Sequence, residues 1–229
     1  MEEVTAAAAA FVGTHFLLSH PLRAPLVART GERGFLLLYS LVAFATLGWL
    51  IVAYRAAPAA TPLWPVGDGL WLVATLVTLV ASILFMGSLV RNPALPDPVG
   101  KAKPVPTPTG VLAITRHPMM WGFALWAVAH ILVFPDPSNV VLCAAIILLA
   151  LVGAHLQDRK KQALQPDFWP EWQARTSYLP FAAIAARRAR LGKIGMHALA
   201  GGVLVWLVAT WAHMPLVGWD AGVWRWATG

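Results

Sequence analysis

The chain is poor in cysteine and in charged residues. Cys143 is the only cysteine among 229 residues, so neither an intrachain disulfide nor a zinc site built from several thiolates can form. Only 12% of the residues are charged and 59% are hydrophobic, whereas a soluble domain carries about 25% charged residues. This composition excludes an ordinary soluble domain and makes the lipid bilayer the expected partner. The net charge of +7 then indicates membrane topology and contact with anionic lipid, and we expect no nucleic-acid partner.

The chain also lacks the basic region that opens a signal peptide, so we expect its N-terminus to belong to the first helix of the mature protein. Apolar runs long enough to approach the roughly 20 residues of a membrane span recur along the chain. They lie near residues 4–21, 35–54, 69–90, 118–134, 139–156 and 198–217. We therefore predict an all-α fold, a polytopic transmembrane helical bundle of about six spans that forms a single domain over residues 1–229.

Basic residues divide unequally between the two sides of such a bundle. The loops within residues 23–33, 91–116 and 157–197 carry 15 Lys and Arg, and the connections on the other side carry 2. Because basic loops stay in the cytoplasm, this split predicts that both termini lie outside. We expect a multi-pass protein of the bacterial inner (cell) membrane.

Two of the cytoplasmic loops have an unusual composition. Residues 92–108, inside the loop 91–116, contain six prolines, which excludes a long helix or strand there and predicts an extended or ordered cover. The segment 157–197 combines many basic residues with aromatic ones, which is typical of a helix lying at the membrane interface with Trp at headgroup level. A plain basic linker is the alternative.

Two histidines are expected deep in the membrane. At about 1.5 Å per residue, His15 lies about 12 Å from the cytoplasmic end of its helix and His130 about 21 Å from the end of its own. His213, about 24 Å up its helix, looks interfacial because it is near the outer end. Buried imidazoles without a thiol pair or an intramembrane carboxylate favour haem b over a zinc hydrolase site. On spacing alone, His15 and His130 could equally hydrogen-bond the backbones of their own helices.

Several blocks of the chain resemble the NnrU family of integral membrane proteins. They are GTHFLLSHPLRAPL, GERGFLLLYSLVAFATLGWL, ITRHPMMWGFALWAVAHILV, QDRKK and ARTSYLPFAAI. The same blocks resemble the zeta-carotene isomerase family, in which two histidines bind haem b. The resemblance implies that His15, ahead of Gly31-Glu32-Arg33, and His130, in the Ala-His step, are the haem and metal ligands. It further implies either a role in nitrogen-oxide (denitrification) metabolism, with a redox partner, or haem-dependent cis–trans isomerisation of a lipophilic polyene. The sequence leaves enzymatic activity and the oligomeric state open.

The triplet Arg116-His117-Pro118 supports a second resemblance, to membrane methyltransferases of the isoprenylcysteine type. These proteins use Arg-His-Pro-x-Tyr-x-Gly to hold S-adenosylmethionine, but Met120 stands here where they have tyrosine. We expect Arg116, His117 and Arg175 to contact the haem propionates or another anion, with lipid headgroup anchoring as the alternative. A methyltransferase and a haem-free membrane scaffold thus stand beside the haem protein as alternative functions.

Overall fold

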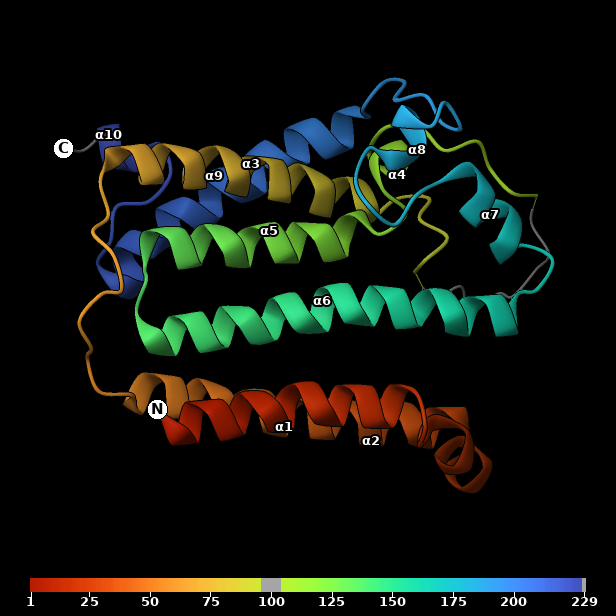
Figure 1. Cartoon of the computed structure of the whole chain (residues 1–229), viewed down its shortest axis with the longest axis horizontal. Helices are drawn as coiled ribbons and strands as arrows, with labels where there is room; N and C mark the ends of the chain where they lie inside the picture. The colour runs from red at the N-terminus through yellow and green to blue at the C-terminus, as the bar shows by residue number, and fades with distance from the viewer. Residues whose placement is uncertain (96–103, 228–229) are drawn as a thin grey trace.

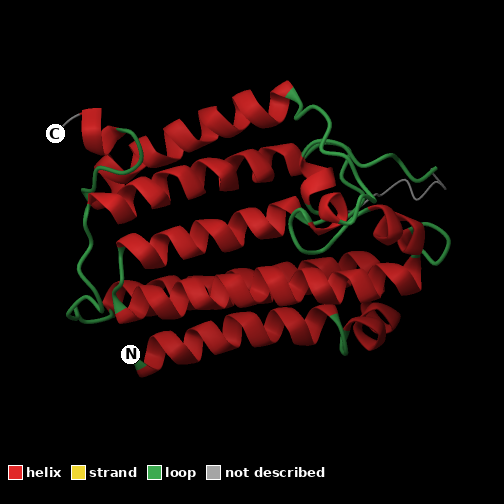
Figure 2. Ribbon diagram, turned by 45° about the horizontal axis from the view of Figure 1, so that its top comes forward, coloured by secondary structure: helices red, strands yellow, loops and turns green. Residues whose placement is uncertain are grey.

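A computed structural model describes residues 1–95 and 104–227 of the chain. The regular structure in this part is helical, which confirms the predicted all-α class (Figures 1 and 2). The long helices are α1 (Glu2–Ser19), α2 (Arg23–Ala56), α3 (Asp68–Ser88), α5 (Pro118–Val133), α6 (Pro137–Leu164) and α9 (Met196–Val217). The short ones are α4 (Val111–Ile114), α7 (Trp169–Arg175), α8 (Ala182–Ala185) and α10 (Trp224–Ala227). Each predicted span falls on one long helix.

Four helices, α2, α3, α6 and α9, are long and apolar enough to cross a membrane, and α5 is a shorter apolar helix. Large apolar side chains such as Leu37, Phe44 and Leu204 are exposed on the outer faces of α2 and α9, as expected of helices that face lipid. These features describe an integral membrane protein. The count of six spans and the side of the termini stay predictions.

Two helices extend beyond the apolar runs that predicted them. α2 begins at Arg23, and Gly31 interrupts it with φ 72° and ψ 170°. Residues other than glycine are strained in this conformation. The Gly-Glu-Arg block therefore forms a kink, across which Arg23 Nη2 and Glu32 Oε1 form a salt bridge of 2.5 Å. α6 continues to Leu164 because the residues that follow its apolar run include good helix formers such as Lys, Gln and Ala.

The long helices pack in the order α9, α3, α5, α6, α1, α2, each against the next. Close approach of α9 to α3 requires Gly202, because a Cβ atom there would lie 2.7 Å from the Cα of Ile83. Both chain termini lie at one end of the bundle, and α4, α7 and α8 lie at the other (Figure 1). This arrangement matches an even number of passages through the bundle.

The segment 157–197 differs from the interfacial helix that its composition predicts. It contains the last turns of α6, the short helices α7 and α8, and connecting loops. Trp169 and Trp172 are 0% exposed and pack with Leu84 and Leu112, so they form a small core at the end of the bundle where α4, α7 and α8 lie (Figure 1). The proline-rich cover predicted ahead of the Arg-His-Pro triplet lies partly outside the described residues, over 96–103.

Candidate functional site

A buried cluster of charged and polar groups lies where α5 begins. Arg116 donates to Asp158 of α6 through Nε, at 3.0 and 2.8 Å from the two carboxylate oxygens, and through Nη2 at 2.5 Å. His117 Nε2 lies 2.8 Å from Asp158 Oδ1. Arg116 is 9% exposed, His117 1% and Asp158 5%. The carboxylate of Asp158 thus joins the first residues of α5 to α6.

The segment after α7 closes this cluster from the other side. Thr115 Oγ1 and Trp121 Nε1 both donate to the carbonyl of Tyr178, at 2.7 and 2.9 Å. The Tyr178 hydroxyl in turn donates to the carbonyl of Leu151 in α6 at 2.7 Å. Burial raises the pKa of Tyr178, and Asp158 adds to the rise while Arg116 opposes it, so the phenol stays protonated and keeps donating. These contacts make the Arg-His-Pro triplet a junction between α5, α6 and the segment 176–181.

The three residues predicted to contact an anion are therefore engaged by the protein itself. Arg116 and His117 share Asp158, whereas Arg175 is on α7, where it pairs with Glu171 and donates to the carbonyl of Val105 at 3.1 Å. Sequence reasoning named the two basic residues of the triplet but missed Asp158 as their partner. The signal was available, because a carboxylate that directly follows an apolar run needs a cationic neighbour when it is buried.

Two cavities stand out among the described residues of the bundle, and the larger of these lies between α1, α2, α5 and α6. Its volume is about 760 Å³, within the range of about 300–1,000 Å³ that is usual for ligand sites. Most of its wall is apolar, and His15, His20, Gln157 and Lys160 supply polar groups. The carbonyl of Phe11 lies 2.6 Å from Nδ1 of His15.

The hydrogen bond of His15 determines which tautomer its imidazole adopts. A carbonyl oxygen can only accept, so Nδ1 carries the proton, and Nε2 of the neutral ring keeps a lone pair. Histidines that bind metals usually have this arrangement, with the other ring nitrogen donating to a carbonyl or carboxylate. His15 is thus prepared to bind a metal through Nε2, although a satisfied helical histidine looks the same.

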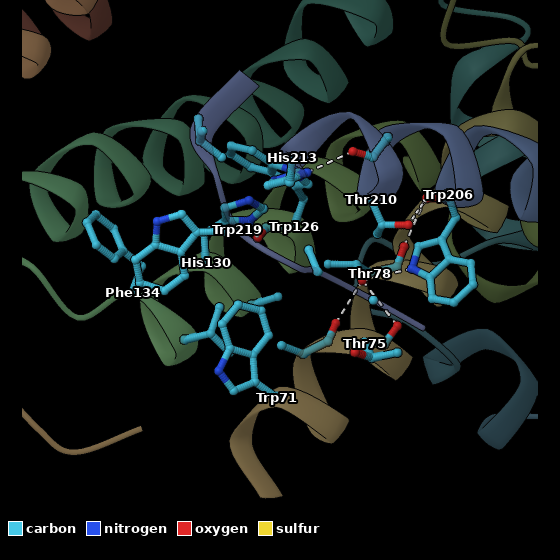
Figure 3. A pocket seen from close by; sticks show the side chains of 18 of the residues that line it. Trp71, Thr75, Thr78, Trp126, His130, Phe134, Trp206, Thr210, His213 and Trp219 are labelled. Atoms are coloured by element: carbon cyan, nitrogen blue, oxygen red, sulfur yellow. Dashed lines mark hydrogen bonds between the residues drawn. The ribbon is translucent and has the colours of Figure 1, made fainter. Parts of the chain in front are cut away.

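The second cavity lies between α3, α5 and α9, toward the end of the bundle that holds both termini, and has a volume of about 320 Å³ (Figure 3). Indole rings form much of its wall, together with His130 of α5 and His213 of α9. The tryptophans are Trp71, Trp126, Trp206 and Trp219. The imidazole centroids of His130 and His213 are 5.9 Å apart. His213, expected near the membrane interface, is therefore part of a cavity wall at this end of the bundle.

The structure does not bring His15 and His130 to the same cavity. His15 lines the larger cavity and His130 the smaller one, whereas Trp126 lines both. The indole of Trp126 stacks on His130, with 3.9 Å between ring centroids. As arranged here, these two imidazoles do not face one another across one flat cofactor.

Comparison with known proteins places the whole bundle in one family. Residues 3–221 match the NnrU protein family. The chain belongs to that family. Its curated relatives include the chloroplastic 15-cis-zeta-carotene isomerases of Zea mays, 36% identical over 85 residues, and of Arabidopsis thaliana, 36% identical over 76 residues.

These matches cover a limited part of each protein. They include 37% and 33% of this chain, and 23% and 21% of the two plant enzymes, so the chain spans less than a quarter of the curated relatives it matches. No solved structure matches.

Proposed function

We propose that this NnrU family protein binds haem b and a lipophilic conjugated molecule inside its membrane bundle and catalyses cis–trans isomerisation of a polyene. The observation that carries this proposal is the 36% identity to 15-cis-zeta-carotene isomerases over 85 residues, in a chain whose bundle contains a large, mainly apolar cavity lined by a histidine. A polyene partitions into the bilayer and reaches such a cavity from lipid without crossing water.

The larger cavity has groups that fit haem b. His15 offers an Nε2 lone pair, because its Nδ1 is used by the Phe11 carbonyl. Lys160 and His20 line the same cavity near the basic end of the bundle, where the cationic Lys160 suits a propionate and the His20 imidazole can donate a hydrogen bond to one. His15, Lys160 and His20 are therefore the residues we assign to the cofactor, and Arg116, His117 and Arg175 are left to the protein's internal contacts.

The second ligand that the family resemblance implies, His130, does not fit this cavity as the side chains stand. Trp126 lies between the two cavities, so His130 would require displacement of the indole ring. Ligation by His15 and His130 together remains a prediction. The variant Trp126→Ala tests this prediction, because removal of the indole would give the imidazole of His130 access to the haem iron. Binding of this second ligand would change the iron from the high-spin to the low-spin state.

The chain's own residues would act by holding and shielding the substrate. Apolar side chains such as Phe16, Leu47, Leu149 and Phe123 line the larger cavity and would keep water away from a conjugated chain beside His15. A bound ferrous haem supplies an electron-rich centre that lowers the barrier to rotation about a conjugated carbon–carbon bond. No acid or base is assigned, because rotation about a bond transfers no proton.

The test is isomerisation of a 15-cis polyene by purified protein in proteoliposomes with dithionite, followed by chromatography of the geometric isomers. We expect turnover by reduced wild type, loss of turnover in His15→Ala, and retention in His155→Ala, whose histidine is exposed and lines neither cavity. Absence of turnover by a haem-loaded wild type would contradict the isomerase proposal and favour an accessory role in nitrogen-oxide metabolism.

The alternative hypothesis, that the protein is a methyltransferase, has less support. Arg116 and His117 are buried and bound to Asp158, whereas a cofactor at the triplet would need them free. Calorimetric titration with S-adenosylmethionine checks this, and we expect no binding.

A further inference from the structure

We infer that the outer part of the larger cavity, toward the end of the bundle that holds both termini, is a subsite for one arm of the polyene. The inference rests on the proposed function and adds to it where the conjugated chain lies and which side chains select it. This arm subsite is formed by apolar side chains of three helices: Phe11 of α1, Leu47 and Leu50 of α2, and Leu142, Ile146 and Leu149 of α6.

The larger cavity is long and runs beside α6. Its lining on that helix extends from Leu142 to Lys160, which at 1.5 Å per residue is a length of about 27 Å. Gly153 marks the level of His15, because a Cβ atom on that glycine would lie 3.9 Å from Cε1 of the neighbouring Phe16. From this level the lining continues for about 10 Å toward Lys160 and about 16 Å toward Leu142.

The polar lining residues of α1 and α6 are at the level of His15 or on its basic side, and they are His15, Ser19, His20, Gln157 and Lys160. Tyr39 of α2 is at the same level, since its ring centroid is 5.5 Å from that of His15. The arm subsite, on the other side of this level, has only apolar side chains. Burial of a propionate there would be costly, so the charged edge of haem belongs to the basic part and the outer part is left for hydrocarbon.

The position of the reacting bond explains why a single arm is held. The bond that is cis in a 15-cis polyene is in the middle of the chain, so an arm extends to each side of it. With this bond beside a haem on His15, one arm occupies the outer part, whose length of about 16 Å is close to half of the roughly 30 Å hydrocarbon core of a bilayer.

The other arm has an exit to lipid between α2 and α5. Both helices line the larger cavity, yet they are not among the helix pairs that pack closely in the described part of the chain. Phe123 of α5, at this edge of the cavity, is 40% exposed. A long apolar molecule can therefore enter sideways from the bilayer, with one arm in the arm subsite and one outside.

The long and narrow shape of the arm subsite favours a conjugated chain over a lipid acyl chain. Conjugation already restricts rotation about the bonds of a polyene, so the polyene loses little conformational entropy when it is held straight. A saturated acyl chain loses more. The arm subsite contains no histidine, so it is compatible with one histidine ligand on the iron and with the two that the family resemblance implies.

The test fills the arm subsite and compares two substrates in proteoliposomes with dithionite. Ile146→Trp places an indole about 10 Å from the level of Gly153. Ala144→Trp, at an exposed position of α6 that lines neither cavity, is the matched control with the same number of tryptophans. We expect Ile146→Trp to lower kcat/KM for a 15-cis polyene with two full arms at least about tenfold, because the indole overpacks the space for the arm.

The second substrate is an analogue with one arm truncated to less than this distance of about 10 Å. It should keep its wild-type kcat/KM in Ile146→Trp, because its short arm ends before the new indole. Ala144→Trp should leave both substrates unchanged. If Ile146→Trp does not fold, Leu142→Phe fills the far end of the arm subsite with a smaller increase in volume, and the same selective loss is expected.

Two further measurements separate this inference from the proposed function. The haem spectrum of Ile146→Trp should equal that of wild type, because haem lies at and below the level of His15. Affinity for the full-length polyene, measured by quenching of tryptophan fluorescence, requires no turnover and should be about tenfold weaker in Ile146→Trp than in Ala144→Trp.

Three results would overturn the inference. They are equal affinity and kcat/KM of Ile146→Trp and Ala144→Trp for the full-length polyene, an equal loss for the truncated analogue, and displacement of the polyene by an equal concentration of a fatty acid of the same length. A haem-loaded wild type that turns over neither substrate, yet binds the polyene more tightly than Ile146→Trp, would contradict the isomerase proposal and support the arm subsite.

Discussion

The substitution Asp158→Asn removes the charge that holds the buried junction at the start of α5. The Asp158 carboxylate accepts from Arg116 Nε and Nη2 and lies 2.8 Å from His117 Nε2. Asparagine has nearly the same shape, but its amide nitrogen is a donor that must face one of these donors. The variant therefore leaves the Arg116 guanidinium uncompensated, with its side chain only 11% exposed.

We expect this substitution to lower the free energy of unfolding by about 3–5 kcal/mol, the usual cost of removing one partner from a buried ion pair. The control is Glu171→Gln, which removes the carboxylate paired with Arg175 on α7. The side chains of that pair are 40% and 50% exposed, and an exposed pair four residues apart on a helix contributes about 0.3–0.5 kcal/mol.

The single thiol of the chain provides the assay. Cys143 is free and 0% exposed, so a thiol-reactive fluorogenic dye reacts with it when the bundle opens. Heating the detergent-purified variants with this dye measures their midpoints of unfolding. A midpoint for Asp158→Asn that matches that of Glu171→Gln would refute the view that this carboxylate holds the bundle together.

The same thiol assay tests two further contacts. Gly202→Ala places a Cβ atom 2.7 Å from the Cα of Ile83, and such overpacking is expected to lower the free energy of unfolding by about 1–3 kcal/mol. In the control Gly13→Ala the new Cβ atom meets nothing within 4 Å, so the midpoint of unfolding should stay unchanged or rise. Tyr178→Phe removes the hydrogen bond to the Leu151 carbonyl and should cost about 1 kcal/mol. A midpoint equal to that of wild type in Tyr178→Phe would mean that this bond contributes nothing to closing the junction.

The helices could be predicted well because hydrophobicity determines them. Each predicted span falls on a long helix, because the backbone N–H and C=O groups of an apolar segment in lipid must form hydrogen bonds within the segment. The extension of α2 back to Arg23 was missed because it precedes the apolar run and depends on the kink at Gly31. The burial of Trp169 and Trp172 was missed because composition alone cannot tell an interfacial tryptophan from one covered by neighbouring segments.

The site was harder to predict because it depends on which helices are neighbours. His15 and His130 were paired through a family resemblance, yet their expected depths, about 12 and 21 Å, differ by about 9 Å along the helix axis. His213, at about 24 Å, is closer to His130 in depth, and the structure places these two rings together. Depth was a usable signal, and the order of helix packing was the missing information. No sequence pattern distinguished Trp126 as the wall between the cavities.

The measurement that tests the central claim most directly is the visible spectrum of purified protein from haem-replete cells, oxidised and after dithionite reduction. Wild type, His15→Ala and the exposed-histidine control His155→Ala should be compared at equal protein concentration. We predict a b-type haem spectrum in wild type and in His155→Ala, and its loss in His15→Ala. Haem-free wild type, or a His15→Ala variant with an unchanged spectrum, would contradict the assignment of the larger cavity as the haem site.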